Sequence, residues 1–245
     1  MATHKGSTRS GQAKSVRILP MAQKVEKGTG LSLRQEQFLA VVLQTGEILK
    51  QFYLSGGTAL SSWYLHHRES YDLDFFSDQS FDGEKIAQWI RQHEKQLHHQ
   101  AFVVNDDFGF YTFLFRYPDN SRFKVDFAHY TAQRITKGMN WKGLEIDSMY
   151  EIAVNKIHTI RTHPRERDYV DLYCILKKTN WSIDKLLIDA DRKFDATTDI
   201  LQVAKHFLKA AEITNYPKML IPFDEHDMYD FYEKLAKKLK SKILK

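Results

Sequence analysis

The 245-residue chain is 42% hydrophobic and 13% aromatic with a formal net charge of +5, which is typical of a folded globular protein of one large or two small domains. It contains no apolar run of the roughly 18 to 20 residues that a membrane-spanning helix needs, and its polar, basic N-terminus lacks the apolar stretch of a secretory signal. Cys174 is the only cysteine, which excludes an internal disulfide and suits a reducing compartment, so we expect a cytoplasmic protein with no membrane partner.

Residues 1–30 carry the excess positive charge. They hold six Lys or Arg against one Glu, a net of +5, and are rich in Gly, Ser and Thr, which predicts a flexible basic leader. Residues 31–130 hold 9 basic and 13 acidic side chains, a net of −4, whereas residues 131–245 hold 21 and 17, a net of +4. A basic second half favours a polyanionic partner such as nucleic acid, although asymmetry of this size is also common without one.

The part of the chain after the leader is expected to mix helices and strands. Apolar residues at helical spacing predict helices over residues 33–50 and 82–98, and a glycine pair at 56–57 leads from a strand into a shorter helix. Pro118-Asp119-Asn120-Ser121 marks a hairpin turn. The expected strands are residues 52–54, 72–76, 101–104, 108–117 and 122–130, and the short helix covers residues 58–66.

The second half is expected to be helical throughout. Apolar positions recur at helical spacing from residue 149 to the C-terminal region. The predicted helices cover residues 149–161, 168–178, a segment from Ser182, 200–212 and 224–244. This change of pattern predicts a domain boundary near residues 138–147.

The glycine turn is the first candidate for chemistry. Gly56 and Gly57 allow a phosphate to approach the backbone closely where a helix begins, and Thr58 can cap that helix or contact a phosphate oxygen. No Gly-Lys-Ser/Thr follows, so the turn is not a Walker loop. Taken alone, a Gly-Gly pair before a helix is often only a turn.

Asp72 and Asp74 are the second candidate. Residues i and i+2 of a strand share a face, so both carboxylates can bind at one metal site. Their apolar neighbours Leu73 and Phe75 indicate a buried strand, where an unpaired carboxylate is costly and a divalent cation would compensate it. The alternative for an isolated Asp-x-Asp is a solvated surface strand.

Asp126 provides a third carboxylate, on a strand whose alternation places it on the same face as Lys124. If this strand lies beside the one that carries Asp72, three carboxylates converge. Such oxygen ligands suit Mg²⁺, and two ions could clamp the attacking and leaving oxygens of a displacement at phosphorus. Arg68 and Ser70 lie just before the Asp pair and could contact phosphates or orient the carboxylates.

Lys156, on a predicted helix, can serve as a point charge for a triphosphate. The arginines that follow can bind phosphate or form an ion-pair network with neighbouring carboxylates, and we favour the network. The groups concerned are Arg161, Arg165 and Arg167 on one side and Glu166, Asp168 and Asp171 on the other.

Taken together, these stretches resemble the AbiEii/AbiGii-type nucleotidyltransferase toxin family, within the DNA polymerase β-like nucleotidyltransferase superfamily. The matching pieces are Gly-Gly-Thr-Ala-Leu from Gly56, His-Arg-Glu-Ser-Tyr-Asp-Leu-Asp-Phe-Phe from His67, Lys-Val-Asp-Phe from Lys124, Lys156, and Arg-Asp-Tyr-Val-Asp-Leu from Arg167. The superfamily pattern has Gly-Ser where this chain has Gly-Gly, and Thr58 could supply the missing hydroxyl.

The resemblance implies an α+β fold, with a mixed sheet and flanking helices followed by an all-helical C-terminal domain that closes over the nucleotide cleft. It assigns residues 31–140 to the catalytic domain and residues 141–245 to the helical domain. It also implies Asp72 and Asp74 as metal ligands, Lys156 as a nucleotide-binding lysine, and Asp168 or Asp171 as the acidic residue of the last motif.

The resulting expectation is a Mg²⁺-dependent nucleotidyltransferase that moves a nucleoside monophosphate from an NTP to the hydroxyl of an RNA end, expected to be tRNA, with a cognate antitoxin as a possible partner. The alternatives are transfer to a protein or small-molecule hydroxyl and a non-catalytic nucleotide- or RNA-binding module. The expected site residues are Asp72, Asp74 and Asp126 for two magnesium ions, Gly56, Gly57, Thr58, Arg68, Ser70 and Lys156 for the triphosphate, and Asp126 or Asp168 for the hydroxyl proton.

Overall fold

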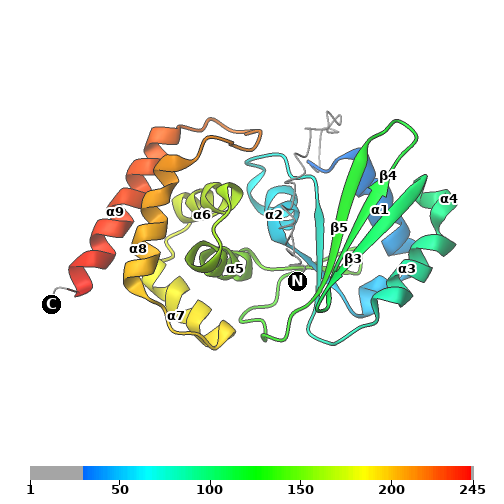
Figure 1. The fold of residues 1–245 in the computed structure, drawn as a ribbon, viewed down its shortest axis with the longest axis horizontal. Helices are drawn as coiled ribbons and strands as arrows, with labels where there is room; N and C mark the ends of the chain where they lie inside the picture. The colour runs from blue at the N-terminus through cyan, green and yellow to red at the C-terminus, as the bar shows by residue number, and fades with distance from the viewer. Residues whose placement is uncertain (1–29, 244–245) are drawn as a thin grey trace, which may run out of the picture.

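The computed structural model describes residues 30–243, so the expected leader lies outside the described residues except for Gly30. Seven strands form one mixed sheet in the order β3-β4-β5-β2-β1-β7-β6 (Figure 1). The strands are β1 (Tyr53–Ser55), β2 (Leu73–Ser77), β3 (Ala101–Asp107), β4 (Phe110–Arg116), β5 (Arg122–His129), β6 (Met139–Trp141) and β7 (Leu144–Ile146).

The centre of the sheet contains the strands on which the sequence analysis depends. Strand β2 pairs in parallel with β5 and antiparallel with β1, and the register places Asp74 opposite Asp126 and Ser55 opposite Asp74. Alternation turns Leu73 and Phe75 of β2 into the core and leaves Asp74 partly exposed on the other face. The expected adjacency of these two acidic strands is therefore confirmed.

One face of the sheet is covered by the helices α1 (Leu33–Thr45), α3 (Gly83–Gln92) and α4 (Glu94–Leu97) (Figure 1). Phe38 of α1 packs there against Phe75, Trp89 and Phe115, with ring centroids 5.7 to 6.1 Å apart. Burial of these aromatic rings supplies much of the apolar area that stabilises this layer. Because successive side chains of a strand point to opposite faces, the packing on this face determines which side chains lie on the other face.

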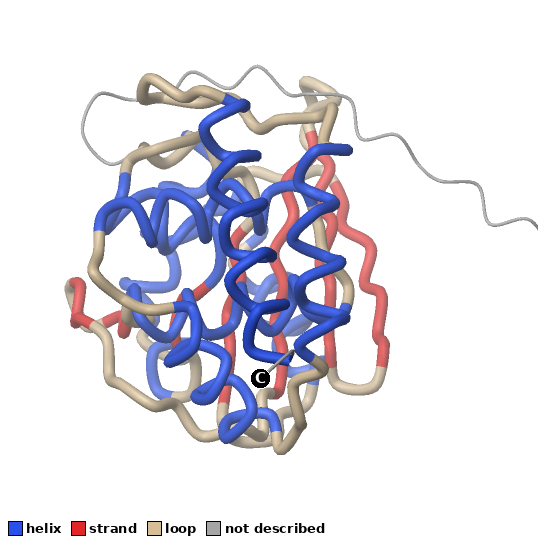
Figure 2. Tube along the Cα trace, turned by 90° about the vertical axis from the view of Figure 1, so that its left-hand side faces the viewer, coloured by secondary structure: helices blue, strands red, loops and turns tan. Residues whose placement is uncertain are grey.

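The opposite face carries α2 (Gly56–Leu60) and the helical half of the chain. That half consists of α5 (Met149–Thr162), α6 (Glu166–Lys178), α7 (Ile183–Phe194), α8 (Ile200–Leu208) and α9 (Glu225–Ile243). Helices α8 and α9 pack side by side on the outside, in front of the sheet as Figure 2 is turned. The α+β fold class, with a mixed sheet and a helical C-terminal half, is confirmed.

The structure corrects several element boundaries. The helix expected over residues 33–50 ends at Thr45, because Gly46 takes a left-handed conformation with φ of 68°, and a short 3₁₀ turn, η1 (Ile48–Lys50), follows. The helix expected over residues 82–98 breaks at His93 into α3 and α4. The short helix after the glycine turn begins at Gly56 and continues as a wide π turn, η2 (Ser61–Leu65).

The segment expected to be a domain boundary instead forms the hairpin β6–β7, which extends the sheet through pairing of β7 with β1. The sheet therefore continues past residue 140, where the sequence analysis places the start of the helical part. After α8, a 3₁₀ turn, η3 (Lys209–Glu212), leads into an irregular segment before α9. Among the described residues, no helix combines the length and apolar character required to cross a membrane.

Candidate active site

A cleft of about 150 Å³ lies where the sheet meets α5 and the start of α6. Eleven of its lining residues come from the end of β1, the glycine turn, the loop before β2, strands β2 and β5, and helices α5 and α6, and they include most of the residues expected from the sequence. These are Ser55, Gly56, Gly57, Arg68, Ser70, Asp72, Asp74, Lys124, Asp126, Lys156 and Arg167. Thr58 and Asp168 are not among the lining residues.

The carboxylates of Asp72, Asp74 and Asp126 face Lys124 across the floor of the cleft. The Lys124 ammonium donates to Asp126 and lies 3.3 Å from Asp72 Oδ2, while Thr112 Oγ1 donates to Asp126 Oδ1 at 2.8 Å. Burial raises the pKa of Asp74 to about 6; Lys124 opposes that rise, and the charges of Asp126 and Asp72 add to it. Three carboxylates are thus close to one ammonium group, that of Lys124, which offsets part of their negative charge.

Asp72, Asp74 and Asp126 are the carboxylates that the sequence predicts as ligands of magnesium. Among residues 30–243, no three His, Cys, Asp or Glu side chains form a group ready to hold a metal ion. The oxygens of Asp72 and Asp126 contact the Lys124 ammonium instead. The carboxylate oxygens of Asp72, Asp74 and Asp126 are of the kind that a hard divalent cation prefers, and the Lys124 ammonium now counters their charge.

The glycine turn contacts the carboxylates so closely that a side chain is excluded. Gly56 has φ of +74°, and a Cβ atom there would lie 2.0 Å from Asp74 Oδ2. A Cβ atom on Gly57 would lie 2.4 Å from Arg68 Nη2 and 3.1 Å from Ser70 Oγ. The bare backbone at these two positions is therefore what allows the turn, Arg68, Ser70 and Asp74 to meet at one point.

Thr58 faces away from the cleft into the protein. Its buried hydroxyl donates to the carbonyl oxygen of Asp72 and accepts from Nε2 of Gln35, at 3.2 Å. Because both directions of hydrogen bonding are used inside the protein, the structure gives Thr58 a supporting position rather than the phosphate contact expected from the sequence.

Gln35, on α1, is a residue that the sequence analysis missed. Its fully buried amide also donates to the carbonyl oxygens of Ser70 at 3.0 Å and Asp72 at 3.2 Å, and its Oε1 accepts from the Ser32 backbone at 2.8 Å. The only signal in the sequence is the Ser32-x-x-Gln35 capping box. That motif indicates a helix start, whereas the side chain here also joins the glycine turn to the Asp72 strand.

A buried ion-pair network forms the helical wall of the site. Arg68 binds Asp171 in a bidentate pair, with Nε to Oδ1 at 2.6 Å and Nη2 to Oδ2 at 2.8 Å. Lys156 Nζ lies 2.6 Å from Asp168 Oδ1 and 2.7 Å from Asp171 Oδ2. Burial opposes ionisation of Asp171, yet Arg68 and Lys156 hold its pKa well below its usual range.

The arginines divide between the network and the solvent. Arg165 Nε lies 3.0 Å from Asp168 Oδ2, and Arg161 pairs with Asp191 on α7. Arg167 is half-buried and lines the cleft, with Nη1 3.6 Å from Asp72 Oδ2. The network interpretation thus describes Arg161 and Arg165, whereas Lys156 both joins the network and lines the cleft.

A buried carboxyl next to the glycine turn was not predicted. Asp147 Oδ2 accepts from Ser55 Oγ at 2.7 Å, and its Oδ1 has no hydrogen-bond partner among the described residues. Burial raises the pKa of Asp147 to about 7, although the hydrogen bond from Ser55 opposes this rise. A single Asp after a short strand gave no sequence signal for this position.

Aromatic rings form the opposite wall of the cleft. Phe76 and Tyr130 stack with ring centroids 5.1 Å apart and planes inclined by 9°, and Phe110 lies beside them among the lining residues. Burial raises the pKa of the Tyr130 phenol, so the phenol stays neutral. Such a surface provides stacking area for a planar base.

Comparisons with known proteins agree with this site. Residues 37–240 match the family model described as Nucleotidyl transferase AbiEii toxin, Type IV TA system. The chain is also 29% identical over 169 residues to the uncharacterized protein aq_aa25 of Aquifex aeolicus (strain VF5), covering 64% of this chain and 72% of that protein.

Two crystal structures share the fold. One, from H. pylori and described as a nucleotidyltransferase, is 18% identical, with a TM-score of 0.56 over 85% of this chain and 94% of the other. The other, JHP933 from Helicobacter pylori, is also 18% identical, with a TM-score of 0.52 over 86% and 94%. Since the family model spans most of the chain, the chain belongs to the AbiEii nucleotidyl transferase toxin family of type IV toxin–antitoxin systems.

Proposed function

We propose that this nucleotidyltransferase moves a nucleoside monophosphate from an NTP to the hydroxyl at an RNA end, with tRNA as the acceptor, in the cytoplasm. The observation that carries the proposal is the meeting of Asp74, Asp126 and the Gly56 turn in one cleft with Lys156. Arg165 and Arg167, which line the cleft, and the net charge of +4 over residues 131–245 support a polyanionic acceptor.

The triphosphate would lie against the glycine turn. Gly56 and Gly57 carry no side chain there, and Arg68 Nη2 and Ser70 Oγ lie close to Gly57. Lys156 would add positive charge from the α5 side while Asp168 and Asp171 hold its ammonium in place. The base would stack on the wall formed by Phe76, Tyr130 and Phe110.

Asp72, Asp74 and Asp126 would hold the magnesium ions. Bound Mg²⁺ supplies positive charge for the phosphate oxygens and aligns the acceptor hydroxyl. Lys124, which now neutralises these carboxylates, would then release them and pair with a phosphate. Burial and the neighbouring carboxylates raise the pKa of Asp74 to about 6, so a bound cation would stabilise its ionised form.

The transfer forms a bond from the acceptor oxygen to the α-phosphorus and breaks the bond between that phosphorus and the oxygen bridging to the β-phosphate. Pyrophosphate leaves with the bonding electrons. The proton of the hydroxyl passes to the carboxylate of Asp126. Asp168 is less suited, because its oxygens are held by Lys156 and Arg165 and it does not line the cleft.

The acceptor is tested by incubating the protein with Mg²⁺, each α-³²P-labelled NTP, and either total RNA or cell-lysate protein. We expect label in RNA of tRNA size. Label confined to protein would contradict the RNA acceptor and support transfer to a protein hydroxyl. Nucleotide binding without any pyrophosphate release would support a non-catalytic module instead.

A further inference from the structure

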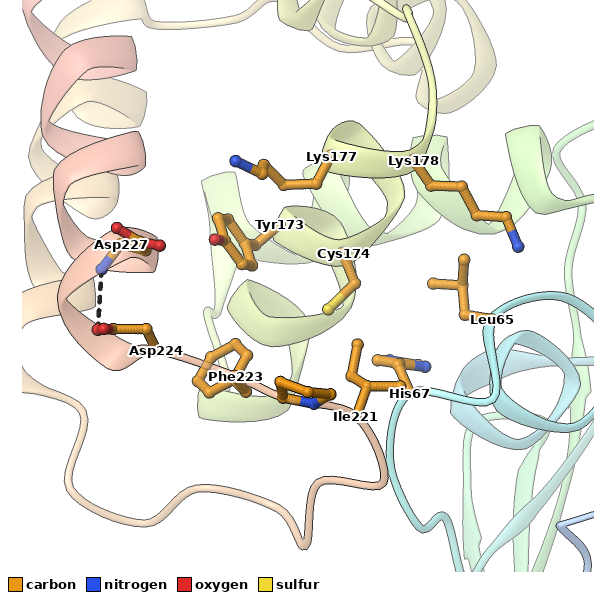
Figure 3. Close-up of a pocket in the computed structure, with 11 residues that line it drawn as sticks. Leu65, His67, Tyr173, Cys174, Lys177, Lys178, Ile221, Phe223, Asp224 and Asp227 are labelled. Carbon is orange, nitrogen blue, oxygen red and sulfur yellow. Dashed lines mark hydrogen bonds between the residues drawn. The ribbon is translucent and has the colours of Figure 1, made fainter.

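A second, larger cavity lies away from the active-site cleft. It has a volume of about 570 Å³ and is enclosed by α6, the loop that begins at His67, and the segment that leads into α9 (Figure 3). The two cavities have no lining residue in common. Its volume falls within the range of about 300–1,000 Å³ found for small-molecule sites.

His67 lines this cavity and carries a hydrogen-bond acceptor that is buried without a partner within residues 30–243. Its side chain is 1% exposed, and Nε2 lies 2.8 Å from Asp171 Oδ1. Burial lowers the pKa of His67 although Asp171 opposes this, so the ring is neutral and Nε2 carries the proton donated to the ionised Asp171. Nδ1 is then a lone-pair acceptor that has no partner among the described residues. Neighbouring groups cover this atom, so a ligand reaches it only when the wall of the cavity shifts.

The rest of the lining includes two aromatic rings, two lysines and two carboxylates. The rings of Tyr173 and Phe223 lie edge to face with centroids 5.9 Å apart. Lys177 Nζ lies 5.9 Å from the Tyr173 ring and forms no ion pair within residues 30–243, whereas Lys178 Nζ donates to the Tyr64 carbonyl oxygen. Of the two carboxylates at the rim, that of Asp224 caps the start of α9 and that of Asp227 is exposed.

We propose that this cavity is a second nucleotide-binding site, in which a base packs on Tyr173 and donates an N–H to Nδ1 of His67 while a phosphate meets Lys177. A ligand that matches this lining needs a planar ring, a hydrogen-bond donor and a negative charge. A nucleotide has all three. The same chemistry is offered by a free nucleotide and by the terminal nucleotide of an RNA.

Residues in the wall of this cavity also contact residues of the active site. Leu220 N donates to the His67 carbonyl oxygen at 2.8 Å, and Glu69 N donates to that of Lys218 at 2.9 Å, so the segment before α9 holds the loop that carries Arg68. Asp171 accepts from both His67 and Arg68. A nucleotide bound at His67 would therefore stabilise the ion pair between Asp171 and Arg68, which positions Arg68.

Cys174 allows this site to be tested apart from the cleft. It lines the cavity and is the only cysteine of the chain, so its alkylation by iodoacetamide reports on this cavity. Burial raises the pKa of the thiol to about 12, so the slow reaction is followed over hours at a pH of about 8, where lysine side chains keep their charge. The rate is measured by mass spectrometry with AMP, with an RNA trinucleotide bearing a free 3′-hydroxyl, and with ribose 5-phosphate, which lacks a base.

We expect AMP or the trinucleotide to slow alkylation at least threefold and ribose 5-phosphate to leave it unchanged. Protection by AMP assigns a free nucleotide, and protection by the trinucleotide alone assigns an RNA end. The partly exposed Ile221 permits Ile221→Trp, which should fill the cavity and remove the protection, whereas Asp74→Asn in the cleft should keep it. Absence of protection by either ligand, or its loss in Asp74→Asn but not in Ile221→Trp, would overturn the proposal.

A milder variant covers the case in which Ile221→Trp does not fold. Lys177 is exposed, so Lys177→Ala should fold normally. It should weaken protection by AMP at least threefold and leave protection by adenosine unchanged, because adenosine has no phosphate. Equal loss for both ligands, or no loss for either, would contradict the phosphate contact. None of these readouts requires nucleotidyl transfer, so the result is independent of the proposed acceptor.

Discussion

Asp74 and Asp126 are register partners on adjacent parallel strands, and the Lys124 ammonium donates to Asp126 and lies within 3.3 Å of Asp72. Two carboxylates on neighbouring strands of a buried sheet repel each other, so the arrangement requires a nearby cation. In this structure Lys124 provides that charge.

Replacement of Lys124 should shift the acidic limb of the pH profile. Asp74 has a pKa of about 6 with Lys124 lowering it, and transfer should require the ionised carboxylate, so activity falls as the pH drops through about 6. In Lys124→Met the pKa of Asp74 should rise, which moves the limb up by about one pH unit. The pH profile of kcat/KM from pH 5 to 9 measures it, because kcat/KM reports the free enzyme, in which Lys124 pairs with the carboxylates. Exposed Lys85→Met is the control. An unmoved limb would show that Lys124 does not set this pKa.

Gly56 and Gly46 form a matched pair for testing the close approach in the turn. Both have positive φ, +74° and +68°, but a Cβ atom would strike Asp74 only at Gly56, while nothing lies within 4 Å at Gly46. Gly46→Ala should cost about 1–2 kcal/mol of stability through backbone strain and leave transfer intact. Gly56→Ala should cost more and abolish transfer. Urea unfolding and transfer assays compare them, and equal activity in both variants would refute the argument.

Asp171 should dominate the stability of the helical wall. Asp171→Asn leaves Arg68 and Lys156 without their shared carboxylate, which should lower the free energy of unfolding by about 3–5 kcal/mol at pH 7. Because the folded pKa is depressed, this stabilisation is present above the unfolded value of about 3.9 and is lost as the pH falls below it.

Urea unfolding at pH 7 and below pH 4 measures this effect. The gap in stability between wild type and Asp171→Asn should narrow at the lower pH, whereas exposed Asp107→Asn should match wild type at pH 7. A gap independent of pH would show that the charge of Asp171 is not the cause.

Gln35 should position the turn without touching a substrate. Gln35→Leu removes the donor shared by Thr58, Ser70 and Asp72, so we expect a loss of about 2–3 kcal/mol in stability. The turn would then shift against Asp74, and kcat should fall roughly 10- to 100-fold. The control Gln37→Leu changes a neighbouring, less buried amide. The same kcat in both variants would contradict a positioning role.

Much of the site could be predicted because its signals are local. Alternation around Asp72, Asp74 and Asp126 fixes which residues share a face, and the glycine pair marks the turn. The register of Asp74 with Asp126 joins residues far apart in the chain, and no local pattern reports it; the sequence analysis could state it only as a condition. The roles assigned to Asp72, Asp74, Asp126 and Lys156 stay predictions.

The features that were missed depend on tertiary contacts. Gln35, Asp147 and His67 each act through one hydrogen bond or a few to residues that lie 23 to 104 positions away, which periodicity does not reveal. The hairpin β6–β7 has three residues per strand, too short for an alternation signal. The helix break at Gly46 follows a known C-cap rule and could have been predicted.

The most direct test of the central claim is Mg²⁺-dependent pyrophosphate release from an NTP in the presence of RNA, compared between wild type, Asp74→Asn and Asp78→Asn. Asp78 follows β2 on the exposed surface and serves as the matched control. The account predicts release by wild type and Asp78→Asn, and a loss of at least about 100-fold in a folded Asp74→Asn. Wild-type release by Asp74→Asn would contradict it.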